Sequence, residues 1–144
     1  MRKILLSIPL CLFGIIAIAQ SETIENLNQP IIKFETEIID YGTIEQESNG
    51  VRKFKFTNMG KSALVISEAK QSCGCTVPTP PKEPIQPGES SVIKVKYDTK
   101  RLGAFNKSVT IISNAERSSV TLKIKGVIIP KKPLEDLKAN SPIE

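Results

Sequence analysis

The chain of 144 residues contains no histidine and no tryptophan. Histidine is the commonest general base near neutral pH and a frequent metal ligand, so its absence removes the usual hydrolytic and zinc-dependent sites. The G-x-S-x-G, G-x-x-x-x-G-K-[ST] and G-x-G-x-x-G patterns of esterase, phosphate-binding and dinucleotide-binding sites are also missing. The sequence therefore predicts a protein that is not an enzyme and has no resident cofactor.

Aromatic residues are scarce, with two tyrosines and five phenylalanines. Proteins that bind single-stranded nucleic acids stack bases on exposed aromatic side chains, and few are available here. The net charge is +5, but the lysines alternate with apolar residues along the predicted strands. In that pattern they form a solvated face that discourages aggregation between sheet edges. We expect no binding to nucleic acid.

Long apolar runs are lacking except at the amino terminus. Met1-Arg2-Lys3 gives a positive start, and the run from Ile4 to Ala19 ends in small residues at the positions that a signal peptidase reads. A membrane anchor is the alternative, but the run is shorter than the roughly 20 apolar residues that cross a bilayer, and a proline interrupts it. We expect residues 1–19 to be a signal peptide cleaved between Ala19 and Gln20. The mature protein would be exported to the periplasm or the extracellular space, without membrane attachment.

Helical periodicity is lacking as well, and a period of two takes its place. Phe54 and Phe56 fall on one face of a predicted strand, and Lys53 and Lys55 on the other. Similar alternation occurs in residues 93–97 and 120–125, and β-branched runs occur in 64–66 and 109–112. Turn residues separate these segments, and the prolines within 77–88 indicate a stiff connection.

The pattern predicts an all-β protein: a single immunoglobulin-like antiparallel β-sandwich of about seven strands over residues 31–129. An open Greek-key barrel is the alternative. A flexible lead is expected at residues 20–30 and a disordered tail at residues 130–144. The expected core consists of Phe54, Phe56, Leu64, Ile66, Ile93, Val95, Val109, Ile111, Leu122 and Ile124.

The chain has three cysteines, and Cys11 would leave with the signal peptide. Cys73 and Cys75 remain, separated by Gly74. The spacing excludes a thioredoxin-type pair, which has two intervening residues, and c-type haem attachment, which needs a following histidine. Too few ligands exist for structural zinc or an iron–sulfur cluster.

Several states of the cysteine pair stay open. In an ideal strand the two Cα atoms would lie roughly 6.6 Å apart, at the far limit for a disulfide, and a bend at Gly74 would bring them closer. Such a bond would close a very short loop, stabilise the fold little and be readily reduced. Two thiolates could instead bind copper as Cu(I), which prefers soft ligands. Thiol exchange and an intermolecular disulfide are further alternatives.

Four stretches together resemble a known bacterial family. They are D-Y-G-T-I (40–44), F-K-F-T-N-M-G (54–60), S-C-G-C-T (72–76) and P-I-Q-P-G-E (84–89). In combination they are similar to the family called domain of unknown function 1573, over most of residues 34–128. The second stretch also resembles immunoglobulin-like domains of the major sperm protein and Hydin type. The resemblance implies an exported immunoglobulin-like domain without an established activity.

Two functional hypotheses follow. The first is a non-catalytic module with a structural or protein-interaction role in the bacterial cell envelope, acting with an unidentified protein partner. The second is a thiol site at Cys73 and Cys75 that binds a soft metal or exchanges disulfides.

Overall fold

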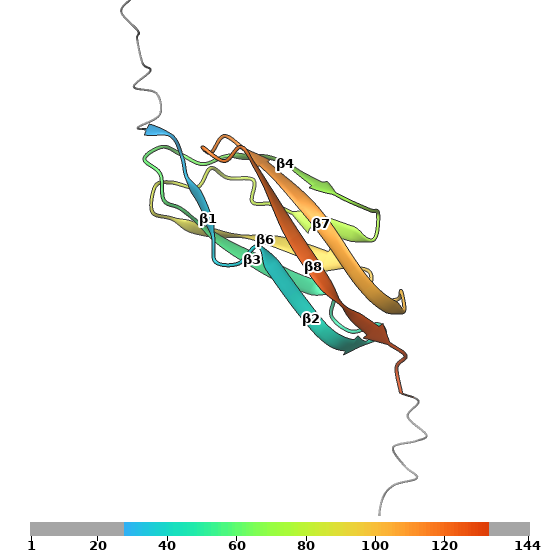
Figure 1. Cartoon of the computed structure of the whole chain (residues 1–144). Coiled ribbons are helices and arrows are strands. Elements are labelled where there is room, and N and C mark those ends of the chain that lie inside the picture. The colour runs from blue at the N-terminus through green and yellow to red at the C-terminus, as the bar shows by residue number, and fades with distance from the viewer. Residues whose placement is uncertain (1–27, 133–144) are drawn as a thin grey trace, which may run out of the picture.

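The computed structural model describes residues 28–132, which form two four-stranded β-sheets packed face to face (Figure 1). This confirms the predicted all-β sandwich. The predicted signal peptide, most of the lead and most of the tail lie outside the described residues. The strands are β1 (Ile32–Phe34), β2 (Ile38–Glu45), β3 (Val51–Asn58), β4 (Ile66–Gln71), β5 (Thr76–Thr79), β6 (Ser90–Tyr97), β7 (Gly103–Ser113) and β8 (Ser119–Ile129).

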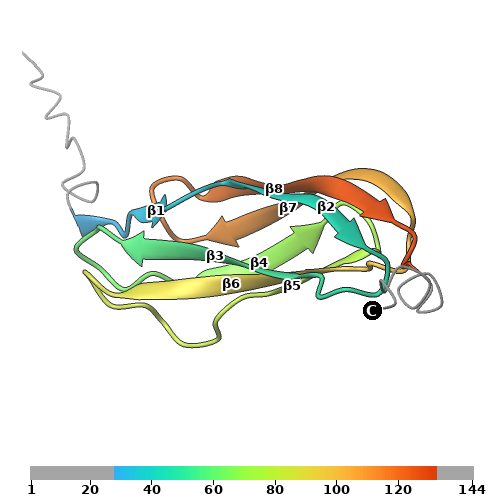
Figure 2. The same cartoon turned by 90° about the horizontal axis from the view of Figure 1, so that it is seen from below.

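The first sheet has the strand order β1-β3-β6-β5 and is antiparallel throughout. The second has the order β2-β8-β7-β4, and its β2 runs parallel to β8 while the other neighbours are antiparallel. The amino-terminal segment thus begins in one sheet and crosses to the other (Figure 2). At the other end of the two strand orders, β5 is an edge of the first sheet and β4 an edge of the second, and one turn connects them.

Eight strands are present where about seven were expected. The pattern does not indicate β1 or β5, which are short edge strands of three and four residues. It also misplaces β4, because only Ile66 of that strand falls in the predicted run 64–66. Pro78 belongs to β5, although the prolines of 77–88 were expected to form only a connection. Proline has no N–H to donate, so it is tolerated on an edge strand, where one side of the backbone needs no partner.

Nine of the ten predicted core residues are buried between the sheets, and Phe54 and Phe56 are completely inaccessible. Ile66 is half-buried instead, and it is the first residue of the edge strand β4. Alternation found the core wherever a strand has neighbours on both sides. It was less reliable at the edges of the sheets.

Three aromatic rings close one end of the core. Tyr97 stacks on Phe105 with centroids 3.9 Å apart, and Tyr41 meets the same ring edge-on at 5.2 Å. The Tyr41 hydroxyl donates a hydrogen bond to the carbonyl of Gly50 at 2.8 Å. Burial raises the pKa of Tyr41, although the Arg52 guanidinium 4.1 Å above the ring opposes the shift. The cluster has a structural role: it packs together three rings from strands that are distant in sequence.

Asn58 organises the opposite end. Its side chain is fully buried, and Nδ2 donates to the carbonyls of Ser62 at 2.8 Å and Ile85 at 2.9 Å. Its Oδ1 accepts a hydrogen bond from the Gly60 N–H at 3.0 Å. A Cβ on Gly60 would overlap the backbone of residues 29–31. The F-x-F-x-N-x-G stretch is therefore explained by the packing of the fold.

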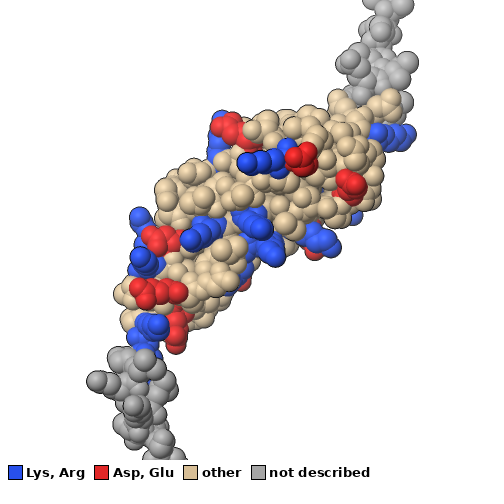
Figure 3. Space-filling view, turned by 180° about the vertical axis from the view of Figure 1, so that it is seen from behind, with Lys and Arg blue, Asp and Glu red and all other residues tan. Residues whose placement is uncertain are grey.

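The surface carries charges of both signs, as the face seen in Figure 3 shows. Ion pairs such as Lys55–Glu35 at 2.7 Å and Lys125–Asp40 at 3.3 Å connect exposed side chains. Pairs of this kind contribute little to stability. Within residues 28–132 no helix is long and apolar enough to cross a membrane.

Candidate functional site

The turn between β4 and β5 holds the two cysteines. Residues 73–75 form a turn rather than a strand, and the Thr76 N–H donates to the carbonyl of Cys73 at 3.3 Å. The turn brings the Cα atoms of Cys73 and Cys75 to 5.4 Å, and the two sulfurs are joined in a disulfide. The separation is within the ordinary range for such bonds, whereas an ideal strand would have stretched it.

The two sulfur-bearing residues differ in exposure. Cys75 is 5% exposed and belongs to the hydrophobic core, whereas Cys73 is partly exposed and packs against that core from outside. Gly74 is exposed, its φ is not positive, and a Cβ added there would meet nothing within 4 Å. One half of the disulfide is therefore accessible, beside an open stretch of backbone.

Thr76 places a hydroxyl beside both sulfurs. Its side chain is completely buried, and its Oγ1 lies 3.8 Å from Cys73 Sγ and 3.9 Å from Cys75 Sγ. These contacts are weak hydrogen bonds while the sulfurs are in a disulfide. A hydrogen bond to a thiolate would be much stronger, because an ionised acceptor strengthens the bond.

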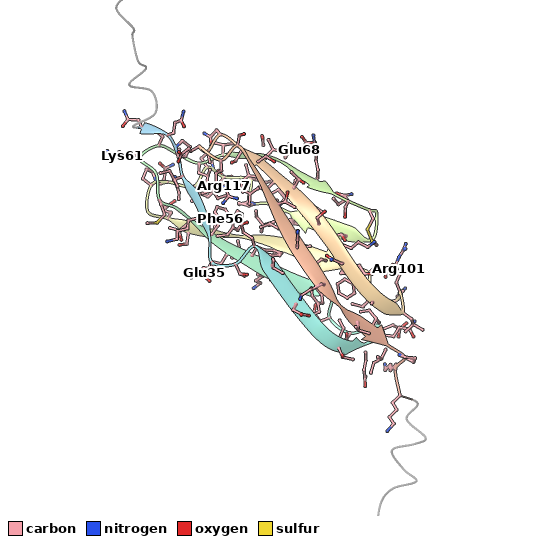
Figure 4. The ribbon with its side chains drawn as sticks, in the orientation of Figure 1. Glu35, Phe56, Lys61, Glu68, Arg101 and Arg117 are labelled. Carbon is pink, nitrogen blue, oxygen red and sulfur yellow. A yellow bond between two sulfur atoms is a disulfide. The ribbon has the colours of Figure 1, made fainter. Side chains whose placement is uncertain are left out.

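A shallow groove of about 510 Å³, largely open to solvent, lies along β4 and the cysteine turn. It reaches Cys73 and Gly74, and Cys75 does not contribute to its wall. On the β4 side it is lined by Glu68, Ala69, Lys70 and Gln71. Glu68 lies at the outer rim of the molecule (Figure 4), and its carboxylate pairs with the Lys70 ammonium at 3.2 Å.

The same groove borders unpaired backbone. The Ser72 N–H donates to the carbonyl of Ser108 in β7 at 3.0 Å, so the backbone groups of Ser72 point toward β7. Backbone groups alternate in direction along an antiparallel strand, so those of Ala69 and Gln71 point away from β7. Among the described residues no strand follows β4 on that side of its sheet. The groove therefore exposes donors and acceptors that a further strand could use.

Two other hollows lie away from the cysteines. One of about 430 Å³ lies over the irregular register of β2 and β8, and Asp40 and Lys125 contribute to it. The N–H of Gly42 and then Lys125 lower the pKa of Asp40. A second, also of about 430 Å³, lies between the loops that contain Ser48 and Thr99. Neither contains a cysteine.

The predicted site residues Cys73 and Cys75 are thus adjacent in space, and Ala19 and Gln20 lie outside the described residues. Within residues 28–132 no group of three or more His, Cys, Asp or Glu side chains gathers as a metal cluster. Sequence reasoning missed the role of Thr76 and the free edge of β4. Thr76 directly follows Cys75 in the S-C-G-C-T stretch, so its position was the available signal.

Comparison with known proteins places this fold. The model of the family described as "Protein of unknown function (DUF1573)" matches residues 32–128. The chain belongs to this family. The match confirms the predicted resemblance. No curated protein matches this DUF1573 chain.

Solved structures similar to this DUF1573 protein share its sandwich. A Porphyromonas gingivalis W83 protein of unknown function has a TM-score of 0.62 and 15% identity, covering 70% of this chain and 48% of its own. The ASH/PapD-like domain 7 of human CEP192 has a TM-score of 0.60 and 7% identity, with coverages of 72% and 89%. Vibrio cholerae VesB protease has a TM-score of 0.50 and 17% identity, with coverages of 71% and 32%.

These likenesses concern the fold alone. The DUF1573 chain spans about half of the P. gingivalis protein and about a third of the VesB protease.

Proposed function

We propose that the protein is an exported, non-catalytic module of the bacterial cell envelope that binds a partner protein along the free edge of β4. The partner supplies an extended segment, which adds as a further strand beside β4. Main-chain hydrogen bonds then give affinity, and the neighbouring groove selects side chains. Export rests on the amino-terminal sequence, and sequencing the secreted protein to find Gln20 first would test it.

The observation that carries this proposal is the unpaired backbone of Ala69 and Gln71 beside a groove of about 510 Å³. The other edges fit less well. β1 has three residues, β5 contains Pro78, and the pairing of β2 is irregular between Asp40 and Thr43. The irregularity of β4 lies at its start, between Ile66 and Glu68, so the part beside the groove is regular.

The test is photocross-linking in the native host. A photoreactive phenylalanine analogue at Gln71 lies at the groove, and the same analogue at the exposed Lys53 lies on the face of the other sheet. We expect a discrete cross-linked product from position 71 and none from position 53. A product from position 53 alone would contradict the proposal.

Proline variants supply the matched control. Ala69→Pro removes an outward N–H, so it should preserve the fold and abolish the cross-link from position 71. Lys70→Pro removes an N–H directed at β7 and should lower the melting temperature instead. A cross-link that survives Ala69→Pro would show that the partner does not add to β4.

Thiol chemistry at Cys73 and Cys75 is the second candidate, favoured by the unequal exposure of the two residues. Cu(I) binding requires prior reduction, since both sulfurs are engaged in the disulfide. It is tested by reducing the protein, loading Cu(I) anaerobically and measuring bound copper. Stoichiometric copper that is lost in Cys73→Ser would favour the metal, and its absence would leave exchange as the thiol function.

A further inference from the structure

We propose that the Cys73–Cys75 disulfide captures a cysteine of the bound partner, with Cys73 as the attacked sulfur and Cys75 as the leaving thiolate. This inference rests on the proposed function, because the β4 groove is what positions the partner. The ligand is an extended protein segment that carries a free cysteine. The product is a mixed disulfide between that cysteine and Cys73.

Access decides which sulfur is attacked. Thiol exchange depends on the sulfur that the thiolate can reach. Cys73 forms part of the groove wall, whereas Cys75 is 5% exposed and faces the core. A thiolate in the groove therefore approaches Cys73, with Cys75 on the side away from the solvent. Gly74 leaves this approach open, because no side chain projects from it.

Thr76 stabilises the departing sulfur. Burial in apolar surroundings disfavours a thiolate, so Cys75 alone would be a poor leaving group. The buried Thr76 hydroxyl lies 3.9 Å from Cys75 Sγ and can donate to it as negative charge develops. Within residues 28–132 the two sulfurs are its hydrogen-bond partners. The hydroxyl can therefore donate its hydrogen bond to whichever sulfur becomes negatively charged.

The step balances without an added oxidant. The partner thiol loses its proton to water, and its thiolate forms an S–S bond to Cys73 Sγ. The Cys73–Cys75 bond breaks, and its electron pair leaves on Cys75, which then takes a proton from water. The reverse attack by Cys75 on Cys73 releases the partner. Because Cys75 is held in the same turn as Cys73, capture is reversible.

The free edge of β4 aligns the incoming cysteine. Gln71 is the last β4 residue whose backbone groups point outward, and Cys73 follows two residues later. Two residues of extended chain span about 7 Å. Cys73 lies in the turn that follows β4, so it is at most about this far from Gln71 and within reach of a segment paired with Ala69 and Gln71. Non-covalent binding and exchange are two uses of one groove.

Glutathione is the probe for the exchange step. The oxidised protein is incubated with glutathione, quenched with acid and analysed by intact mass and by fragmentation of the tryptic peptide 71–82. We expect one glutathione per chain, attached to Cys73. Attachment to Cys75, equal attachment to both, or no attachment under any thiol concentration would overturn the proposal.

Single variants test the polarity independently. Cys75→Ser leaves Cys73 as a free thiol at the groove, and Cys73→Ser leaves Cys75 as a buried thiol. The first should react with an aromatic disulfide reagent at least about tenfold faster than the second. Equal rates would contradict the assigned roles.

Thr76→Val removes the hydroxyl with little change of shape, and Thr79→Val on the exposed face of the same strand is its control. We expect glutathione exchange to slow about tenfold in the first and to stay unchanged in the second. The pH dependence separates this role from a structural one. Without the hydroxyl, release of glutathione from the Cys73 adduct by Cys75 should require higher pH, and an unchanged pH dependence of release would oppose the role of Thr76.

The failures of the two proposals are distinguishable. Ala69→Pro should lose the cross-link from position 71 and retain exchange with glutathione. Cys73→Ser with Cys75→Ser should retain the photocross-link from position 71 and lose every mixed disulfide. A cross-link from position 71 without any disulfide exchange would contradict the exchange at Cys73 and leave partner binding along β4 standing. Exchange without a cross-link would contradict partner binding along β4.

Discussion

The F-x-F-x-N-x-G stretch at residues 54–60 and the S-C-G-C-T stretch at residues 72–76 are both unusual in sequence, but the fold uses them differently. In the first, Asn58 is fully buried with its side-chain groups bonded inside the protein, and the backbone of residues 29–31 fills the space beside Gly60. In the second, Gly74 has open space beside it, and Cys73 is part of a groove wall.

This difference separates motifs that build the fold from motifs that the fold leaves available. Every distinctive residue of the first stretch has a packing or hydrogen-bonding explanation within the chain. The second stretch retains an accessible sulfur and an open glycine that packing does not require. A functional role is therefore better assigned to residues 72–76 than to residues 54–60.

The largest loss of stability should come from Phe56→Ala. Phe56 is completely inaccessible and lies 5.4 Å from the ring of Phe34, so truncation leaves a cavity in the core. We expect unfolding free energy to fall by about 3–5 kcal/mol. Urea denaturation followed by circular dichroism measures it. A loss below about 1 kcal/mol would mean that the core relaxes around the cavity.

How much of this could be read from the sequence depends on the number of neighbours a strand has. Lys53 to Phe56 alternate cleanly because β3 is flanked by β1 and β6, and one face is buried. β4 and β5 are edges, so their burial is partial and their sequences lack the alternation. The two cysteines were identified from spacing alone. Their unequal exposure, the hydroxyl of Thr76 and the groove depend on tertiary packing, which no local pattern encodes.

Two glycine variants compare the stretches directly. Gly60→Ala would force its Cβ into backbone atoms and should cost at least about 2 kcal/mol, as overpacking does. Gly74→Ala meets nothing within 4 Å and should change stability by less than about 1 kcal/mol. The added methyl should nevertheless slow glutathione attachment to Cys73. Thermal unfolding and exchange rates of both variants provide the readouts, and equal losses of stability would break the contrast.

Removing both cysteines should have a smaller effect than removing one buried ring. The disulfide closes a loop of only three residues, which constrains the unfolded chain weakly. Cys73→Ser with Cys75→Ser should therefore cost about 1–2 kcal/mol and leave the fold intact. Denaturation of the oxidised protein against the double variant measures the difference. Complete unfolding of the variant would assign the pair to structure instead of exchange.

The smallest expected effect concerns Asp40, in the D-Y-G-T-I stretch. The Gly42 N–H donates to its carboxylate at 2.8 Å and Lys125 pairs with it at 3.3 Å, and both lower its pKa. A folded pKa below the unfolded value, about 3.9, means that the charged form stabilises the fold above that pH. The contribution is lost as pH falls through the lowered pKa.

Asp40→Asn should thus be slightly less stable than the wild type at pH 7, with the gap closing in strong acid, and its glutathione exchange should be unchanged. Denaturation at several pH values measures the gap, and a gap that widens toward low pH would contradict the assigned direction. Because Asp40 is exposed and bonded to Gly42 and to Lys125 of the neighbouring strand, even a clear result would place this stretch with residues 54–60, as part of the scaffold.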